Sequence, residues 1–350
     1  MDSMTRVRDA ALALGAAVAL LGSAQPDERT TLRALAASYY AGAPAIAKVT
    51  GRDTTMDYYN RLVADLAEQD TTPPPNYDAT LFYGTMHEIG RLDISLATQL
   101  MQRSYVPMSQ IRGLDETFVQ SSADGTMQPV AVYVPTTYVP GKAAPLVVFL
   151  HGHGETETQL LAPKFVRDLA EKSGAIVVAP YGRAYFDFSG SENDVYDALA
   201  AAKSAFTIDA RKRFLAGFSM GGFSVYRIAP MKPNEWAGVM SISGSLLKPE
   251  GDRVVAELHA TPFYVVTGEN DDNIPCDIST AAAVYLRFNG VPVSYYMQPK
   301  GVHRLSSLLP MLTQAWNDML AGVVRTTRFS TNATLPWVSP PTASPKPSPS

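Results

Sequence analysis

The segment Gly217-Phe-Ser-Met-Gly221 contains the residue types that nucleophilic catalysis needs. A serine hydroxyl is a weak nucleophile unless the backbone exposes it in a cleft beside a base. Here an apolar, strand-like run precedes Ser219 and a helix-compatible segment follows it. Flanking glycines permit a tight strand-to-helix turn, because a Cβ there would collide with the neighbouring chain. The same pattern is typical of flexible Gly/Ser loops, so Ser219 becomes a candidate nucleophile only with a base and an acid.

Five histidines are present, and His303 has the context that suits a general base. It follows the last apolar run and precedes a helix-like segment, so its loop is expected at the carboxyl end of a strand. His87 lies in a helical region, and His259 precedes a strand at its amino end. The sequence therefore predicts that His303 takes the serine proton. The alternative is a solvated loop histidine.

Three acidic residues, Glu269, Asp271 and Asp272, follow the penultimate apolar run. Asp271 is favoured over Asp272 because it lies where the loop before Pro275 should turn inward. An acid there would accept the Nδ1–H of His303, fix its tautomer and stabilise the imidazolium. The other acids are expected to cap the next helix or to face solvent.

Backbone N–H groups for an oxyanion are expected from two places. One is Met220, directly after the nucleophile, and the other is the glycine-rich loop 150–155, where His153 is the predicted donor and Gly154 the alternative. His151 is expected to brace this loop. A metal site at His151 and His153 is disfavoured, because no carboxylate or cysteine completes the set at ligand spacing. We therefore predict neither metal nor cofactor.

An aromatic cluster follows a central apolar run and is a candidate wall for an acyl or aromatic pocket. Its members are Tyr181, Tyr185, Phe186 and Phe188. The alternative is that these rings only pack beneath a surface loop.

Short apolar runs alternate with helix-length stretches and indicate the elements that position these residues. Six such runs occur, at 146–150, 175–179, 213–216, 238–242, 263–266 and 291–296. Buried runs of this kind predict a mainly parallel α/β sheet covered on both faces, with ligands bound at the carboxyl ends of its strands. An antiparallel hairpin is predicted before them, from segments 117–120 and 130–134.

The N-terminus is typical of an export signal. Arg6 and Arg8 precede an apolar stretch over 10–21, and small residues at 22–24 suit a signal peptidase. We expect a signal peptide over 1–24 and a secreted or periplasmic protein. The single cysteine, Cys276, excludes an internal disulfide, and no apolar run is long enough for a membrane span in the mature chain. A net charge of −4 disfavours a nucleic-acid partner.

Three further regions are predicted. Residues 25–108 are expected to form a helical segment, 109–327 a catalytic domain, and 328–350 a disordered Pro/Ser-rich tail. We hypothesise that the helical segment packs near the mouth of the site and shapes entry.

Taken together, these motifs resemble the α/β-hydrolase superfamily. The resemblance covers 112–320, and within it the chain is most similar to secreted bacterial esterases related to polyhydroxybutyrate depolymerases and feruloyl esterases, and to prolyl-oligopeptidase-type catalytic domains. It rests on Leu150-His-Gly-His-Gly, Gly-Phe-Ser-Met-Gly-Gly, Gly-Glu-Asn-Asp-Asp-Asn-Ile-Pro and Gly-Val-His, in the chain order Ser, Asp, His. Thr267 departs from it, because many relatives have a histidine before the glycine.

The resemblance implies a Ser219 nucleophile, a His303 base and an Asp271 acid. The expected function is hydrolysis of small or polymeric carboxylic esters through an acyl-enzyme intermediate. Two alternatives are a serine peptidase acting on short peptides and a non-catalytic binding protein that keeps the same fold.

Overall fold

The computed structural model describes residues 79–102, 104–186 and 191–325. The predicted signal peptide (1–24), the first part of the predicted helical segment (25–78) and the predicted tail (328–350) lie outside the described residues. Within the described ranges, no helix combines the length and apolarity needed to cross a bilayer.

The core of the molecule is an eight-stranded sheet in the order β1-β2-β4-β3-β5-β6-β7-β8. Strands β1 and β2 form an antiparallel hairpin, β2 pairs antiparallel with β4, and all later pairs are parallel. The strands are β1 Gly113–Gln120, β2 Met127–Val134, β3 Ala144–Leu150, β4 Ile176–Pro180, β5 Ile208–Phe218, β6 Gly238–Ile242, β7 Phe263–Gly268 and β8 Val293–Gln298. The predicted mainly parallel sheet with its leading hairpin is therefore confirmed.

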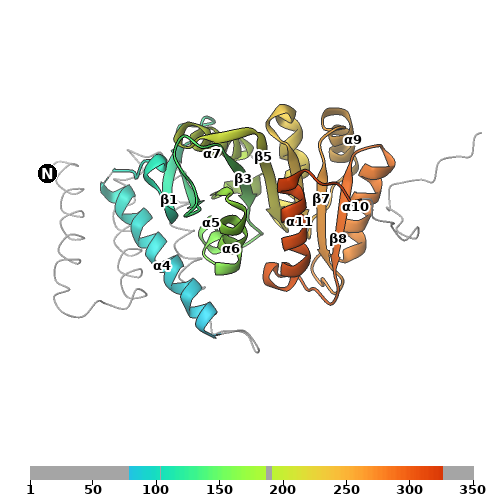
Figure 1. Cartoon of the computed structure of the whole chain (residues 1–350), viewed down its shortest axis with the longest axis horizontal. Coiled ribbons are helices and arrows are strands. Elements are labelled where there is room, and N and C mark those ends of the chain that lie inside the picture. The colour runs from blue at the N-terminus through green and yellow to red at the C-terminus, as the bar shows by residue number, and fades with distance from the viewer. Residues whose placement is uncertain (1–78, 103, 187–190, 326–350) are drawn as a thin grey trace, which may run out of the picture.

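Helices cover both faces of the sheet (Figure 1). They are α5 Glu157–Leu161, α6 Lys164–Ser173, α7 Ser191–Ala205, α8 Met220–Ile228, α9 Lys248–Glu257, α10 Cys276–Phe288 and α11 Leu309–Ala321. Two hydrophobic cores lie on opposite faces of the sheet, and β3 contributes to both because side chains of a strand alternate between faces. Leu146 and Val148 join the core under α7, α8, α9 and α10, whereas Val147 and Phe149 join the core under α5, α6 and α11.

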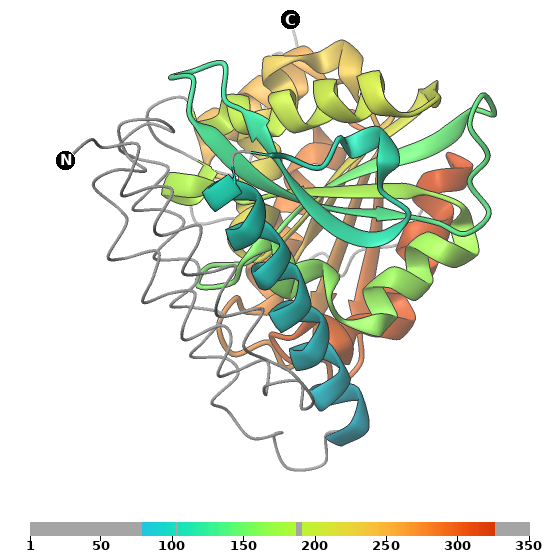
Figure 2. The same ribbon diagram turned by 90° about the vertical axis from the view of Figure 1, so that its left-hand side faces the viewer.

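A long helix, α4 Ala79–Gln102, lies at the β1 end of the sheet in both views (Figures 1 and 2). Ile89, Leu92 and Leu96 are buried along one stripe, as their spacing of three and four residues requires. Two side chains of α4 bond to the backbone of β1. Arg91 Nη2 donates to the carbonyl of Leu114 at 2.7 Å, and Gln99 Nε2 donates to that of Glu116 at 2.9 Å. These bonds fix α4 against the sheet.

A buried charge network around Arg183 ties the β1–β2 turn to α7. Arg183 pairs with Asp194 at 2.7 Å and with Asp124, and it donates to Ser121 Oγ at 2.9 Å. Burial raises the pKa of Asp194 despite the guanidinium beside it. At Asp124 burial also acts to raise the pKa, but hydrogen bonds from Arg183 and Thr126 outweigh it and lower the pKa to about 2.

This network predicts a large loss of stability for Arg183→Met. Asp194 is only 4% exposed, and a buried carboxylate that loses its partner destabilises a fold by about 3–5 kcal/mol. The melting temperature should fall by roughly 10 °C. Without Arg183 the folded-state pKa of Asp194 rises further above its unfolded value. The stability that the variant loses relative to the native chain therefore grows as pH rises. Thermal unfolding at pH 5 and pH 8 should show the smaller deficit at pH 5.

The matched control is Lys203→Met, which removes the 3.0 Å surface pair with Glu235. That change should lower the free energy of unfolding by less than about 1 kcal/mol at either pH. Equal losses for the two variants would contradict the role assigned to the buried network.

Candidate active site

The turn between β5 and α8 holds Ser219 in a backbone conformation that residues other than glycine rarely adopt. Its φ is 51° and its ψ is −114°, so the residue is strained and projects from a sharp strand-to-helix corner. Glycine is required beside it. A Cβ on Gly217 would lie 2.1 Å from the carbonyl oxygen of Gly221, and a Cβ on Gly221 would lie 2.4 Å from that of Leu150. The close approach of three backbone segments therefore forms the turn.

Gly217→Ala is accordingly expected to damage both stability and catalysis. The new methyl group has to displace backbone atoms, and overpacking of this kind costs about 1–3 kcal/mol or more. A displacement of about 1 Å at the reacting oxygen lowers turnover by about 100-fold. Thermal unfolding and steady-state ester hydrolysis would measure the two effects.

Gly84→Ala is the control, because Gly84 is an exposed residue of α4 and nothing lies within 4 Å of a Cβ added to it. It should leave activity intact and stabilise the helix by up to about 1 kcal/mol. A Gly217→Ala variant with native stability and turnover would contradict the close backbone contacts described for this turn.

Ser219, His303 and Asp271 come together at the carboxyl edge of the sheet. His303 Nε2 lies 2.9 Å from Ser219 Oγ, and both Asp271 oxygens lie 2.9 Å from His303 Nδ1. The side chain of Asp271 is fully buried, and its Oδ1 also accepts the amides of Asn273 at 3.1 Å and Ile274 at 2.8 Å. The geometry suits Nδ1–H donation to the carboxylate, which leaves Nε2 free to accept a proton.

The loops after β7 and β8 are joined to each other, which aligns Asp271 with His303. The amide of Asn270 donates to the carbonyl of Gly301 at 2.8 Å, and the amide of Lys300 donates to Glu269 Oε2 at 2.9 Å. Glu269 thus braces the histidine loop, and Asp272 faces solvent. Of the three acids after β7, only Asp271 contacts the imidazole.

The glycine-rich loop after β3 lies against the turn that holds Ser219. The carbonyl of His151 accepts the amide of Gly221 at 3.1 Å, and the amide of Gly152 donates to Glu155 Oε2 at 2.9 Å. The ring of His151 braces the loop, through the carbonyl of Gly152 at 2.9 Å and through that of Tyr181.

The first amides of a helix have no partner within it, and Met220 is the first residue of α8. Its N–H is therefore suited to bind an oxyanion. His153 lies in the same neighbourhood as an exposed residue, and its part as second donor stays a prediction, as does that of Gly154.

The aromatic pocket predicted after β4 is not what the described residues form. Phe186 has no exposed surface and packs in the core, with its ring centroid 5.2 Å from that of His151. It therefore braces the loop from inside and does not line a cavity, so its assignment to the pocket is wrong. The reason is its φ of 57°, which turns the chain back beneath Gly182. Tyr181 is half-buried, and the Tyr185 side chain and Phe188 lie outside the described residues.

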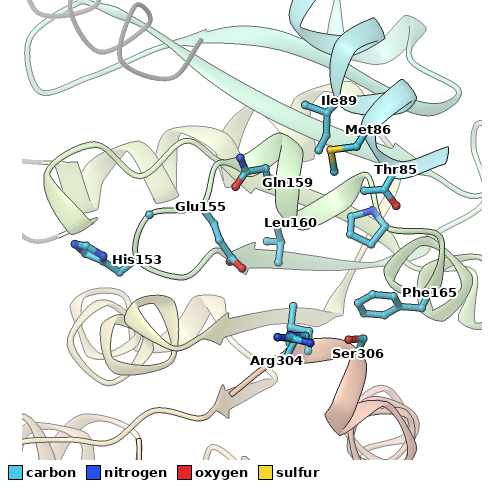
Figure 3. A pocket seen from close by; sticks show the side chains of 13 residues that line it. Thr85, Met86, Ile89, His153, Glu155, Gln159, Leu160, Phe165, Arg304 and Ser306 are labelled. Atoms are coloured by element: carbon cyan, nitrogen blue, oxygen red, sulfur yellow. The ribbon is translucent and has the colours of Figure 1, made fainter. Parts of the chain in front are cut away.

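A pocket of about 410 Å³ opens instead between α4 and the loop segments 153–155 and 304–306 (Figure 3). It is lined by Thr85, Met86, Ile89, His153, Gly154, Glu155, Gln159, Leu160, Pro163, Phe165, Arg304, Leu305 and Ser306. The sequence motifs contain only His153 and Gly154 of this lining, and the other residues come from segments 85–89, 155–165 and 304–306. Helix α4 therefore borders this pocket, and the hypothesis that the helical segment shapes entry stays a prediction. Within the described ranges, no three His, Cys, Asp or Glu side chains are grouped to hold a metal ion.

Comparison with known proteins finds similarity to esterases. Residues 121–284 match the Esterase family, described as "Putative esterase". The chain is 28% identical over 153 residues to a bifunctional acetylxylan esterase/xylanase of Neocallimastix patriciarum, covering 42% of this chain and 22% of that protein. It is 27% identical over 177 residues to a probable feruloyl esterase C of Aspergillus oryzae, covering 47% and 63%. The chain thus spans less than two thirds of the length of these relatives.

Two solved structures share the fold. A ferulic acid esterase superposes with a TM-score of 0.52 at 19% identity, over 59% of this chain and 98% of the other. A fluorophosphonate-binding serine hydrolase of Staphylococcus aureus gives 0.50 at 16% identity, over the same shares. The α/β-hydrolase fold expected from the sequence is therefore confirmed.

Proposed function

We propose that this chain, which matches the esterase family over residues 121–284 and has the α/β-hydrolase fold, hydrolyses carboxylic esters with Ser219 as nucleophile, His303 as base and Asp271 as orienting acid. One observation supports the proposal above all others. The continuous hydrogen-bonded chain from Ser219 Oγ through the imidazole to a buried carboxylate has the connectivity that acyl transfer by serine requires.

The geometry supports a two-step reaction. His303 Nε2 takes the proton of Ser219 as the oxygen attacks the ester carbonyl, and the imidazolium is stabilised by Asp271. The developing oxyanion accepts the N–H of Met220 and a second N–H from the loop of His153, and one such donor contributes about 3 kcal/mol to the barrier reduction. The imidazolium protonates the leaving alcohol, and a water activated by the same base then releases the acid.

The names of the relatives suggest the first substrates. The chain is similar to proteins described as acetylxylan and feruloyl esterases, so we propose acetyl and hydroxycinnamoyl esters as the acyl groups to screen first.

We also propose export of the chain, on the basis of residues 1–24. Arg6, Arg8 and the apolar stretch after them support the presence of a signal peptide. Expression of the full chain in a bacterial host, followed by fractionation and N-terminal sequencing, tests this. A mature N-terminus near residue 25 outside the cytoplasm is expected, and an uncleaved cytoplasmic product would contradict it.

Activity-based labelling with a fluorophosphonate tests the function most directly. The probe should modify one peptide, at Ser219, and the labelled protein should lose activity on p-nitrophenyl acetate and on methyl ferulate. Matched aminoacyl-anilides should be hydrolysed at least 100-fold more slowly than esters. Faster anilide cleavage would favour a peptidase, and no labelling with no turnover would favour a binding protein that keeps the fold.

A further inference from the structure

We propose that the pocket beneath α4 is the subsite for the leaving alcohol of the ester, with Arg304 and Met86 as specificity-determining residues. The inference rests on the proposed ester hydrolysis. The ligand it predicts is an alcohol that carries a ring-sized group with several oxygen acceptors. A methyl alcohol would leave the subsite unfilled.

The path of the proton indicates that the pocket takes the alcohol part of the ester. The leaving oxygen has to lie within hydrogen-bond reach of His303 Nε2, which returns the proton to it. Arg304, Leu305 and Ser306 follow this histidine directly and line the pocket. A second border is the loop after β3, which packs against the turn of Ser219, since the carbonyl of His151 accepts the amide of Gly221 at 3.1 Å. Glu155 accepts the amide of Gly152 at 2.9 Å, and a Cβ built on Gly152 would lie 3.2 Å from the ring of Phe218, the residue before Ser219.

The lining combines an apolar wall with hydrogen-bonding groups. Met86 and Ile89 lie on the opposite side of the pocket from Arg304 and Ser306 (Figure 3). The Arg304 side chain is exposed and forms no ion pair with any residue in the described ranges, so its donors are available to oxygen acceptors. A volume of about 410 Å³ falls within the range of small-molecule sites, about 300–1,000 Å³. Such a lining suits a ring with an apolar face and polar edges.

The α4 wall lies outside the segment that matches the family. Thr85, Met86 and Ile89 all precede residue 121, where the family match begins. The bonds of Arg91 and Gln99 to β1 hold the helix in place, so its residues form a fixed boundary for the pocket. The family match alone therefore does not predict the alcohol selectivity of this chain.

The test compares two esters of one acyl group, methyl ferulate and a glucosyl ferulate. For Arg304→Gln, the ratio of kcat/KM for the glucosyl ester to that for the methyl ester should fall about 10-fold to 100-fold, as expected for lost charged hydrogen bonds. Arg211→Gln is the control, because Arg211 is exposed on β5 outside the pocket and should leave the ratio unchanged. An unchanged ratio for Arg304→Gln overturns the assignment, even if both rates fall.

Met86→Trp tests the α4 wall independently. The larger side chain should fill the pocket and raise KM for the glucosyl ester at least 10-fold relative to the methyl ester, whereas Met86→Leu should preserve the ratio. Equal effects of Met86→Trp on both esters would overturn the role of α4. If the native chain hydrolyses neither ester, ester hydrolysis itself fails, and this outcome is distinct from native activity with an unchanged ratio.

Discussion

Ser219→Ala is expected to reduce kcat for ester hydrolysis by about 10⁴-fold to 10⁶-fold, because no other hydroxyl takes its place as nucleophile. The only hydrogen bond of Ser219 Oγ within the described residues is the 2.9 Å contact with His303 Nε2. Removing it leaves the backbone turn intact, and alanine tolerates a φ of 51° about as poorly as serine does. The melting temperature should therefore change little while turnover collapses.

Steady-state kinetics on p-nitrophenyl acetate, with fluorophosphonate labelling of the same samples, would measure this loss. Ser204→Ala is the matched control, since Ser204 is exposed on α7. It should retain full activity and full labelling. Substantial turnover by Ser219→Ala, with labelling at another residue, would mean that the nucleophile lies elsewhere.

Most of the sheet is predictable from the sequence because its strands are buried on both faces. The run at 146–150 is apolar at every position, and the structure buries all of it in two separate cores. Strand β5 begins earlier than predicted, at Ile208, because Arg211 and Lys212 extend it into solvent, where no apolar pattern marks a strand.

The candidate site also contains residues that the sequence could place and one that it could not. Ser219, Asp271 and His303 follow three different apolar runs, and the parallel sheet brings their carboxyl ends to one edge. Strand order is enough to place them together. Phe186 could not be placed from its type, because its burial depends on a positive φ inside a short turn.

The pocket beneath α4 was unpredictable for a related reason. Met86 and Arg304 lie far apart in sequence and belong to no motif, and their meeting depends on where α4 packs. That packing combines the buried stripe of Ile89, Leu92 and Leu96 with polar contacts such as Arg91 with the carbonyl of Leu114. A hydrophobic pattern locates the buried stripe of a helix but does not identify the element that the stripe covers.

Asp271→Asn is expected to lower kcat by about 10⁴-fold without unfolding the protein. The carboxylate accepts His303 Nδ1–H through two oxygens at 2.9 Å, and this fixes the tautomer in which Nε2 can accept the serine proton. Oδ1 also accepts the amides of Asn273 and Ile274, so the carboxamide oxygen of asparagine will keep that position. Its NH₂ group then faces Nδ1 and donates to it, which places the ring proton on Nε2. The imidazole can no longer act as the base.

Asp272→Asn is the matched control, because it makes the same chemical change one residue away on an exposed side chain. Activity and melting temperature should stay within about twofold and a few degrees of the native values, since substitutions at such surface positions usually change stability by less than 0.5 kcal/mol. Phosphonate labelling of Asp271→Asn should slow in parallel with kcat, because both reactions need the same proton transfer. If Asp272→Asn were the inactive variant and Asp271→Asn the active one, the acid would have to be reassigned to the neighbouring residue.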